Sequence, residues 1–161
     1  MNTANWQCPL PDEDRVSELA GLFRGGLQAP LVIYLRGELG AGKTTFARAL
    51  IHALGYGGRV KSPSYGLLES YSAGGLHILH LDLYRVEDPA ELDYLGLHDL
   101  LGANSVLLVE WPDKGAGFLP GPDLVMQFQE TAGDRSVQLT PHTPEGAKLS
   151  QWVQELAQGI F

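Results

Sequence analysis

The chain has 161 residues, of which 44% are hydrophobic and 19% are charged, and its formal net charge is −8. This length and composition are those of one globular domain with its own core, and they exclude a disordered or membrane-embedded chain. The acidic balance opposes direct binding to a nucleic-acid backbone, so we expect no contact with DNA, and any RNA should be held by a partner.

The first fifteen residues, "MNTANWQCPLPDEDR", contain the single cysteine of the chain, Cys8. One cysteine forms no internal disulfide, which fits a reducing compartment, and we expect an inert thiol near a frayed terminus. The segment lacks the basic flank and apolar stretch of a secretory signal, and no apolar run approaches the ~20 residues of a membrane span. We therefore expect a cytoplasmic protein with no membrane contact.

The first half of the chain predicts helix, strand, glycine turn and helix, in that order. Residues 12–27 place Val16, Leu19, Leu22 and Phe23 on one helical face. The run "LVIYL" at 31–35 is continuous and apolar, as expected of a strand that is covered on both faces. A second helix follows over 44–54 and should end at Gly55.

The second half predicts two antiparallel pairs, a buried strand and two helical segments. Alternation of apolar and polar residues over "LHILHLDLY" indicates a strand that forms a hairpin with the preceding "SYGLLESY". The capping motif "DP" opens a helix that Gly96 interrupts, and Thr143 is a candidate cap for the closing helix. The remaining segments are a buried strand at 105–110 and a pair of strands at 123–130 and 135–140.

The stretch "GELGAGKT" between the buried strand and the second helix carries the strongest motif. Gly37, Gly42, Lys43 and Thr44 satisfy G-x-x-x-x-G-K-[ST]. Glycines allow backbone N–H groups to converge on phosphate oxygens, and the following helix adds its positive N-terminal end. Lys43 should span the β- and γ-phosphates, the Thr44 hydroxyl should ligate Mg²⁺, and Thr45 should reach the α-phosphate. The predicted nucleotide cradle is Gly37, Glu38, Leu39, Gly40, Ala41, Gly42, Lys43, Thr44 and Thr45.

Hydrolysis of a bound nucleotide also requires acidic residues, and two strands end in acids. Asp82 closes "LHILHLD" and Glu110 closes "SVLLVE". We interpret Asp82 as the metal-side carboxylate and Glu110 as the residue that orients water or serves as a second metal-shell acid. The predicted metal-binding set is therefore Thr44, Asp82 and Glu110, and the predicted catalytic set is Lys43, Asp82 and Glu110.

Other residues remain open to two interpretations. Ser64, in "VKSPSYG", could approach the γ-phosphate as part of a switch segment or be an exposed turn serine. Lys61 and Arg85 could neutralise phosphate charge but are more typical of solvated surface residues. The histidines show no metal-binding spacing, and His77 and His80 are interpreted as structural. Tyr84 and Trp111 could line a nucleotide or partner surface, or pack in the core.

The absence of an internal repeat or long linker predicts one P-loop ATPase domain over residues 1–161. The expected fold is α/β, with a single P-loop NTPase-like domain and a mixed central β-sheet with helices on both faces.

Four motifs in this order resemble the TsaE family, also known as YjeE. They are "GELGAGKTTFARAL", "VKSPSYGLLESY", "HLDLYRVEDPAELDYLGL" and "LLVEWPDK", and the resemblance runs from about residue 18 to residue 135. Ser64 stands where the family usually has threonine in "SPTF", a change that keeps the hydroxyl, and Glu110 with Trp111 matches the family's "EW" element.

The resemblance implies a P-loop α/β fold, binding of ATP or ADP with Mg²⁺, and a complex with the proteins TsaD and TsaB. In that family TsaD performs the transfer that makes tRNA N6-threonylcarbamoyladenosine, and the ATPase, weak alone, is thought to reset the complex between turnovers. By position, the resemblance assigns Lys43 and Thr44 to the phosphate loop and Asp82 to the metal side. It places Ser64, Glu110 and Trp111 at the nucleotide, and tRNA would be reached only through the complex.

Two other functions remain open from the residues alone. A small-molecule kinase shares the phosphate loop, but its lid usually carries several arginines, and only Arg59 and Arg85 lie between Gly57 and Asp93. A nucleotide-dependent interaction module with negligible hydrolysis is the second alternative. A GTPase is disfavoured because the chain contains no N-K-x-D motif.

Overall fold

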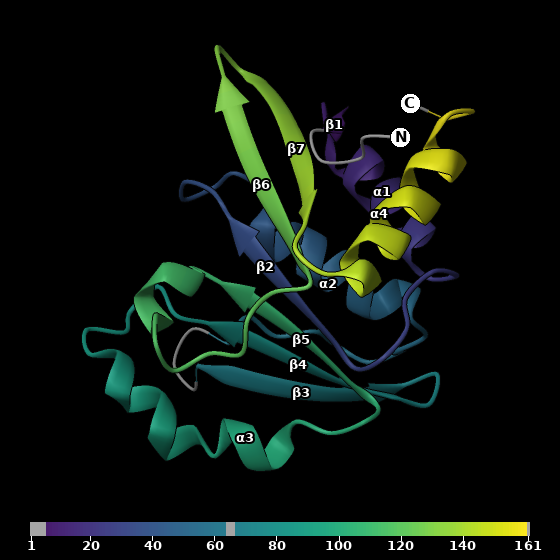
Figure 1. The fold of residues 1–161 in the computed structure, drawn as a ribbon. Helices are drawn as coiled ribbons and strands as arrows, with labels where there is room; N and C mark the ends of the chain where they lie inside the picture. The colour runs from purple at the N-terminus through teal and green to yellow at the C-terminus, as the bar shows by residue number, and fades with distance from the viewer. Residues whose placement is uncertain (1–5, 64–66, 161) are drawn as a thin grey trace.

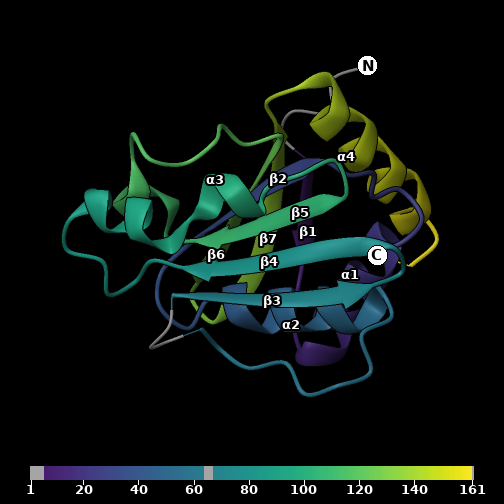
Figure 2. The ribbon, with the colours of Figure 1, turned by 90° about the horizontal axis from the view of Figure 1, so that it is seen from below.

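The computed structural model describes residues 6–63 and 67–160, and its centre is one seven-stranded mixed sheet (Figures 1 and 2). The strand order is β1-β7-β6-β2-β5-β4-β3. The strands are β1 (Trp6–Pro9), β2 (Leu31–Arg36), β3 (Leu68–Ala73), β4 (Leu76–Asp82), β5 (Ser105–Glu110), β6 (Leu124–Thr131) and β7 (Asp134–Pro141).

The four central strands β6, β2, β5 and β4 run parallel. Antiparallel partners flank them on both sides, β3 against β4 at one edge and β7 with β1 at the other. Because parallel strands end at the same edge of a sheet, the phosphate loop after β2, the acids that end β4 and β5, and the turn after β6 all lie along one edge.

The three longer helices cover one face of the sheet (Figure 2): α1 (Glu13–Phe23), α2 (Lys43–Ala53) and α4 (Pro144–Ala157). Phe46 of α2 joins them to the sheet, because its ring lies 5.2 Å from that of Phe23 in α1 and 5.9 Å from that of Phe128 in β6. Each helix buries an apolar stripe, and Thr143 caps α4 by accepting a hydrogen bond from Gly146 N at 3.1 Å, as the sequence predicted.

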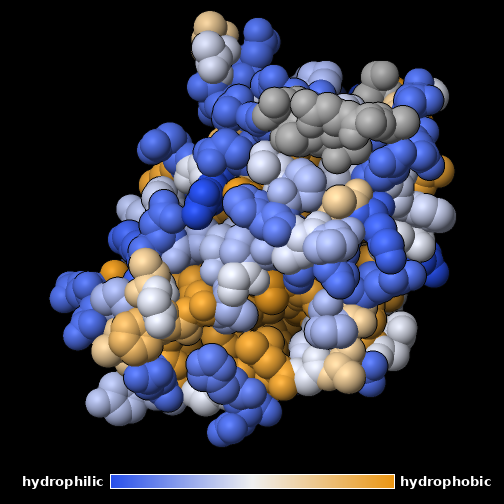
Figure 3. Space-filling model, viewed as in Figure 1, coloured by the Kyte–Doolittle hydropathy of each residue, from blue (hydrophilic) through white to orange (hydrophobic). Residues whose placement is uncertain are grey.

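The opposite face carries shorter elements: the 3-10 segments η1 (Pro89–Leu95) and η2 (Pro112–Gly115), and the short helix α3 (Leu97–Leu100). Helices therefore lie on both faces, as expected, but the second face has only this four-residue α-helix among the described residues. Figure 3 shows apolar side chains gathered in the lower part of this side, around β3, β4 and β5. The cap at Asp88 and the interruption at Gly96, which has φ of 67°, are both as the sequence predicted.

Both predicted hairpins are present, but strand β1 was not expected. The proline-rich start of the sequence has no strand pattern, yet β1 pairs with β7 at the sheet edge. Proline is tolerated at the end of an edge strand, because its missing N–H removes no essential hydrogen bond between strands. The expectation of a frayed terminus around Cys8 is therefore wrong. Its side chain is fully buried in the core below α1, α2 and α4, and burial raises the pKa of the thiol to about 11.

Among the described residues, no helix is both long enough and apolar enough to cross a membrane.

The burial of Cys8 predicts an unreactive thiol in the native protein. With a pKa of about 11, only about one thiol in a thousand is ionised at pH 8, and the reagent must also reach a fully buried sulfur. We expect negligible labelling by a maleimide or disulfide reagent in native buffer and complete labelling in denaturant, measured by mass spectrometry. Rapid native labelling would contradict the pairing of β1 with β7.

Candidate nucleotide-binding site

The phosphate loop between β2 and α2 adopts a backbone that requires glycine. Gly37, Gly40 and Gly42 have φ values of 146°, 80° and 112°, all in the region that other residues avoid. Gly37 also packs directly against β6, since a Cβ on it would lie 2.6 Å from the carbonyl oxygen of Phe128. The start of the loop is therefore fixed on the sheet.

Lys43 is the first residue of α2, and its side chain is only 4% exposed. Its ammonium group donates hydrogen bonds to the carbonyls of Gly37 and Glu38, the latter at 2.9 Å, and lies 4.1 Å from the centre of the Trp111 ring. Burial lowers the pKa of Lys43, whereas the nearby carboxylates of Glu110 and Asp82 act in the opposite direction. The loop thus holds a buried cation at its centre.

The N-terminus of α2 points at the same place. Gly42 at the N-cap has no side chain to satisfy the first backbone amides, and the first turn contains no acidic residue. An anion is the group that best complements such a helix end.

The two predicted acids lie side by side. Asp82 of β4 is paired with Glu110 of β5 in the register of the parallel strands. The Thr44 hydroxyl donates a hydrogen bond to Glu110 Oε1 at 2.7 Å, which links the acids to the phosphate loop. Partial burial, together with the charge of Glu110, raises the pKa of Asp82. The sheet therefore brings together four of the residues that the sequence singled out as candidates, namely Lys43, Thr44, Asp82 and Glu110.

His80 is a member of this cluster whose role the sequence did not show. Its Nε2 lies 2.6 Å from Glu110 Oε2, and both side chains are almost fully buried. A carboxylate only accepts hydrogen bonds, so this nitrogen carries the proton. The structural interpretation of His80 was incomplete, although its alternation with Asp82 on one face of β4 was a signal that could have revealed the contact.

Trp111 and Tyr84 form the aromatic side of the site. Trp111 follows β5 in the left-handed conformation, with φ of 57°, and its ring lies 5.2 Å from that of Tyr84. This backbone conformation is uncommon for a bulky residue, and it places the ring over Lys43. Of the two interpretations left open by the sequence, lining of the site is the one that the geometry supports.

A cavity of about 170 Å³, which we call the phosphate cavity, lies between these groups. Lys61 and Arg85 do not line it, and Ser64 lies outside the described residues. Arg135, at the start of β7, does line it and was not singled out in the sequence because it is remote from every motif. The lining residues are Leu39, Gly40, Gly42, Lys43, Thr44, Thr45, Asp82, Tyr84, Glu110, Trp111 and Arg135.

The donor groups in the phosphate cavity fit Mg²⁺. Hydroxyl and carboxylate oxygens converge from Thr44, Asp82 and Glu110, and Mg²⁺ prefers oxygen ligands. Within the described parts of the chain, no group of three or more His, Cys, Asp or Glu side chains could enclose a metal. Mg²⁺ is usually bound through one or two carboxylates together with substrate phosphates.

A mixed α/β sheet with a glycine loop between a parallel strand and a helix defines the class of P-loop NTPase-like proteins. A crystal structure of YdiB from Bacillus subtilis has the same fold, with a TM-score of 0.78 and 23% identity, covering 96% of this chain and 97% of that one.

The chain belongs to the TsaE family, because the sequence model of "Threonylcarbamoyl adenosine biosynthesis protein TsaE" matches residues 10–137. A tRNA threonylcarbamoyladenosine biosynthesis protein TsaE from Haemophilus influenzae is 40% identical over 119 residues, which are 74% of this chain and 75% of the relative. The protein of the same name from Bacillus subtilis is 32% identical over 158 residues, which are 98% of this chain and 96% of that relative.

Two glycines of the loop differ in their surroundings, which makes a matched pair of substitutions informative. Gly37→Ala should lower the free energy of unfolding by about 2 to 4 kcal/mol, because its φ is strained for alanine and the new Cβ would collide with the Phe128 carbonyl. Gly40→Ala, with nothing within 4 Å, should lower it by only about 1 kcal/mol. Urea unfolding measures both values, and equal losses would show that β6 does not fix the loop.

Proposed function

We propose that this protein is the ATP-binding and ATP-hydrolysing subunit that supports formation of tRNA N6-threonylcarbamoyladenosine by resetting a TsaD–TsaB complex between turnovers. The observation that carries the proposal is the hydrogen bond from Thr44 to Glu110, which sets the phosphate loop against two strand-end acids. Membership of the TsaE family is the reason for placing the protein in threonylcarbamoyladenosine biosynthesis.

Binding of ATP or ADP would use the loop and the start of α2. The Lys43 ammonium group would exchange its bonds to the Gly37 and Glu38 carbonyls for phosphate oxygens, and the helix end would add its uncapped amides. Thr44 and Asp82 would hold Mg²⁺, which neutralises charge on the β- and γ-phosphates. Thr45, which lines the same cavity, would meet the α-phosphate.

Hydrolysis would depend on Glu110 in a defined position. Its carboxylate is held between the Thr44 hydroxyl and the His80 imidazole, so it has little freedom to rotate. A carboxylate fixed beside Mg²⁺ can orient a water molecule toward the γ-phosphate or ligate the metal through water. Ser64, which lies outside the described residues, would approach the γ-phosphate as part of a switch segment.

The assignment to a complex with TsaD and TsaB rests on the family. The net charge of −8 leaves the chain without the overall positive charge that direct tRNA binding favours, so tRNA would be reached through the complex, in the cytoplasm.

A small-molecule kinase is disfavoured, because the phosphate cavity is lined by one arginine among the described residues rather than by several that could clamp two substrates.

A nucleotide-dependent interaction module is the alternative function that one observation favours. The Glu110 carboxylate is engaged by Thr44 and His80 and the Lys43 ammonium by loop carbonyls and Trp111, so the site is closed by internal contacts. A nucleotide whose binding only rearranged these contacts would signal to a partner protein without being hydrolysed rapidly. Low activity in isolation fits both functions, and a hydrolysis assay in the presence of the partners separates them.

Lys43→Ala should abolish binding of Mg·ATP in isothermal titration calorimetry, because it removes the one buried cation in the phosphate cavity among the described residues. We expect at least a hundredfold loss of affinity, of the order that removal of a buried charge–charge contact produces. Lys148→Ala, on the exposed side of α4, is the matched control and should bind normally. Unchanged affinity in Lys43→Ala would mean that the loop does not bind phosphate.

Glu110→Gln should retain Mg·ATP binding but lose roughly a hundredfold or more in hydrolysis measured with TsaD and TsaB. The variant should also fail to support multiple rounds of tRNA modification. A reaction from which the protein is omitted should fail in the same way. Asp113→Asn is the control, because this exposed acid pairs with Arg36 at 3.2 Å and does not line the cavity. Multiple turnover without hydrolysis would favour the interaction module, and full modification without the protein would refute the proposed function.

A further inference from the structure

A cavity of about 820 Å³ lies between the second half of α2 and the connection that leads from this helix to β3. Figure 2 shows the connection beside α2 and β3. None of the residues that line the cavity has a part in phosphate binding or hydrolysis as proposed above. We call this space the basic cavity, and its lining residues are Arg48, His52, Gly57, Gly58, Arg59, Val60, Lys61 and Ser62.

The lining of the basic cavity is positively charged, although the chain as a whole is acidic. Arg48, Arg59 and Lys61 are three of the 11 basic residues of the sequence, and no acidic residue of the described chain lines the cavity. His52, four residues after Arg48 on the same face of α2, adds an imidazole. Like charges that converge without a carboxylate repel one another, so an anion from outside the chain would be stabilised here.

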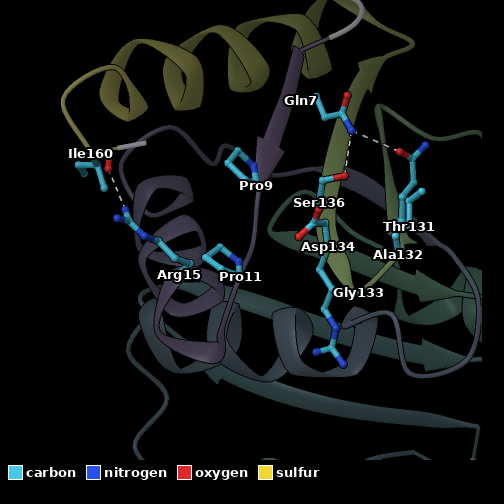
Figure 4. A pocket seen from close by; sticks show the side chains of 12 residues that line it. Gln7, Pro9, Pro11, Arg15, Thr131, Ala132, Gly133, Asp134, Ser136 and Ile160 are labelled. Carbon is cyan, nitrogen blue, oxygen red and sulfur yellow. Dashed lines mark hydrogen bonds between the residues drawn. The ribbon is translucent and has the colours of Figure 1, made fainter.

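Three other arginines of the protein show the contrast, because Arg15, Arg36 and Arg135 each pair with a carboxylate. The Arg15 guanidinium group also donates a hydrogen bond to the Ile160 carbonyl at 2.8 Å, as Figure 4 shows. The three basic residues of the basic cavity take part in none of the ion pairs found over residues 6–63 and 67–160. Their charges are therefore available to a partner.

The connection that carries two of these charges is held in place by its neighbours. His52 Nε2 lies 3.1 Å from the carbonyl oxygen of Gly58, which ties the connection to the end of α2. The Tyr71 hydroxyl of β3 accepts a hydrogen bond from Lys61 N at 3.1 Å and donates one to the Lys61 carbonyl at 3.2 Å. Val60 is buried in the core. Because the backbone is fixed before a partner arrives, less entropy is lost when the partner binds.

The lining favours the carboxylates of a protein over a nucleic acid. No aromatic ring lines the basic cavity in the part of the chain that the structure describes, so bases would have no surface on which to stack. The net charge of −8 also repels a long polyanion such as RNA, whereas an acidic protein segment carries only a few charges. Guanidinium groups form paired hydrogen bonds with carboxylates, and arginine is enriched in protein interfaces.

We propose that the basic cavity is the surface on which an acidic segment of a protein partner docks, with Asp and Glu side chains of that segment on Arg48, Arg59 and Lys61. This inference rests on the proposed function, in which the partner is the TsaD–TsaB complex. It adds the surface through which the protein holds that complex.

The position of the basic cavity connects docking to the nucleotide site. Helix α2, which carries Arg48, begins at Lys43 in the phosphate cavity. The connection, which carries Arg59 and Lys61, leads along the chain to Ser64, the residue proposed above to approach the γ-phosphate. A partner docked on the basic cavity therefore contacts two segments that both lead to the phosphates.

Reversal of two charges tests the docking surface without touching the phosphate loop. The double variant Arg59→Glu with Lys61→Glu should bind the TsaD–TsaB complex about tenfold more weakly or worse, because acidic groups would then face acidic groups. Calorimetry with a non-hydrolysable ATP analogue present measures this affinity. The affinity of the isolated variant for ADP should stay within about twofold of that of the unmodified protein.

The matched control is the double variant Arg24→Glu with Lys148→Glu. It changes the net charge by the same amount, at two exposed positions that do not line the basic cavity. This control should bind the TsaD–TsaB complex normally. Equal weakening in both double variants would show an effect of net charge alone and would overturn the proposal.

Arg48→Glu is a second test, because this residue lies on α2 and not on the segment that leads to Ser64. It should also weaken binding of the complex, by about threefold or more. Added salt should weaken binding of the unmodified protein more than binding of either variant, since salt screens exposed charges. Normal affinity of the complex for Arg48→Glu, or for the Arg59 and Lys61 double variant, would overturn the proposal.

The unmodified protein gives a measurement that does not depend on the folding of a variant. A carbodiimide joins a lysine amine to a carboxylate in contact with it, as an amide, with loss of one water. Treatment of the assembled complex should join Lys61 to an Asp or Glu of TsaD or TsaB, identified by mass spectrometry. Crosslinks to the partners at Lys114 or Lys148 without any at Lys61 would contradict the docking surface.

The outcomes separate this inference from the proposed function. If the TsaD–TsaB complex fails to bind the unmodified protein, the proposed function is wrong and the docking surface falls with it. If the complex binds the unmodified protein and the Arg59 and Lys61 double variant equally, only the docking surface is wrong. If that variant loses binding of tRNA but keeps binding of the complex, the basic cavity is a site for RNA phosphates, which also refutes the proposal.

Discussion

The buried carboxylate of Glu110 is the constraint on which the arrangement of the site depends. A charge in this position is costly unless hydrogen bonds satisfy it, and Thr44 and His80 supply those bonds from two different elements. The start of α2, the end of β5 and the middle of β4 are thereby held together at one point. A displacement of any of the three would leave a buried polar group without a partner.

Strand pairing and core packing explain how the fold builds the site from segments that are distant in the sequence. Parallel pairing of β2 with β5 and β6 brings the phosphate loop, the acids and the β6–β7 turn to one sheet edge. The core residue Phe46 in turn fixes α2 on the sheet through the rings of Phe23 and Phe128. Packing of the core and placement of the charged groups are therefore two results of one topology.

Much of the fold could be predicted because the signals were local. Continuous apolar runs indicated β2 and β5, alternation indicated β4, and the caps at Asp88 and Thr143 were correct. Strand β1 could not be predicted, because a short edge strand that contains proline has no pattern of its own. Its pairing with β7, at Trp6 and Leu139, joins residues separated by most of the chain.

The sequence by itself determined the phosphate loop and its acids, since G-x-x-x-x-G-K-[ST] and a carboxylate at a strand end are properties of short segments. Only the tertiary structure decided that His80 meets Glu110, that Trp111 covers Lys43 and that Arg135 lines the phosphate cavity. Those contacts depend on strand order and on register across the sheet. Neither leaves a local pattern in one sequence, because side chains that meet across neighbouring strands are far apart along the chain.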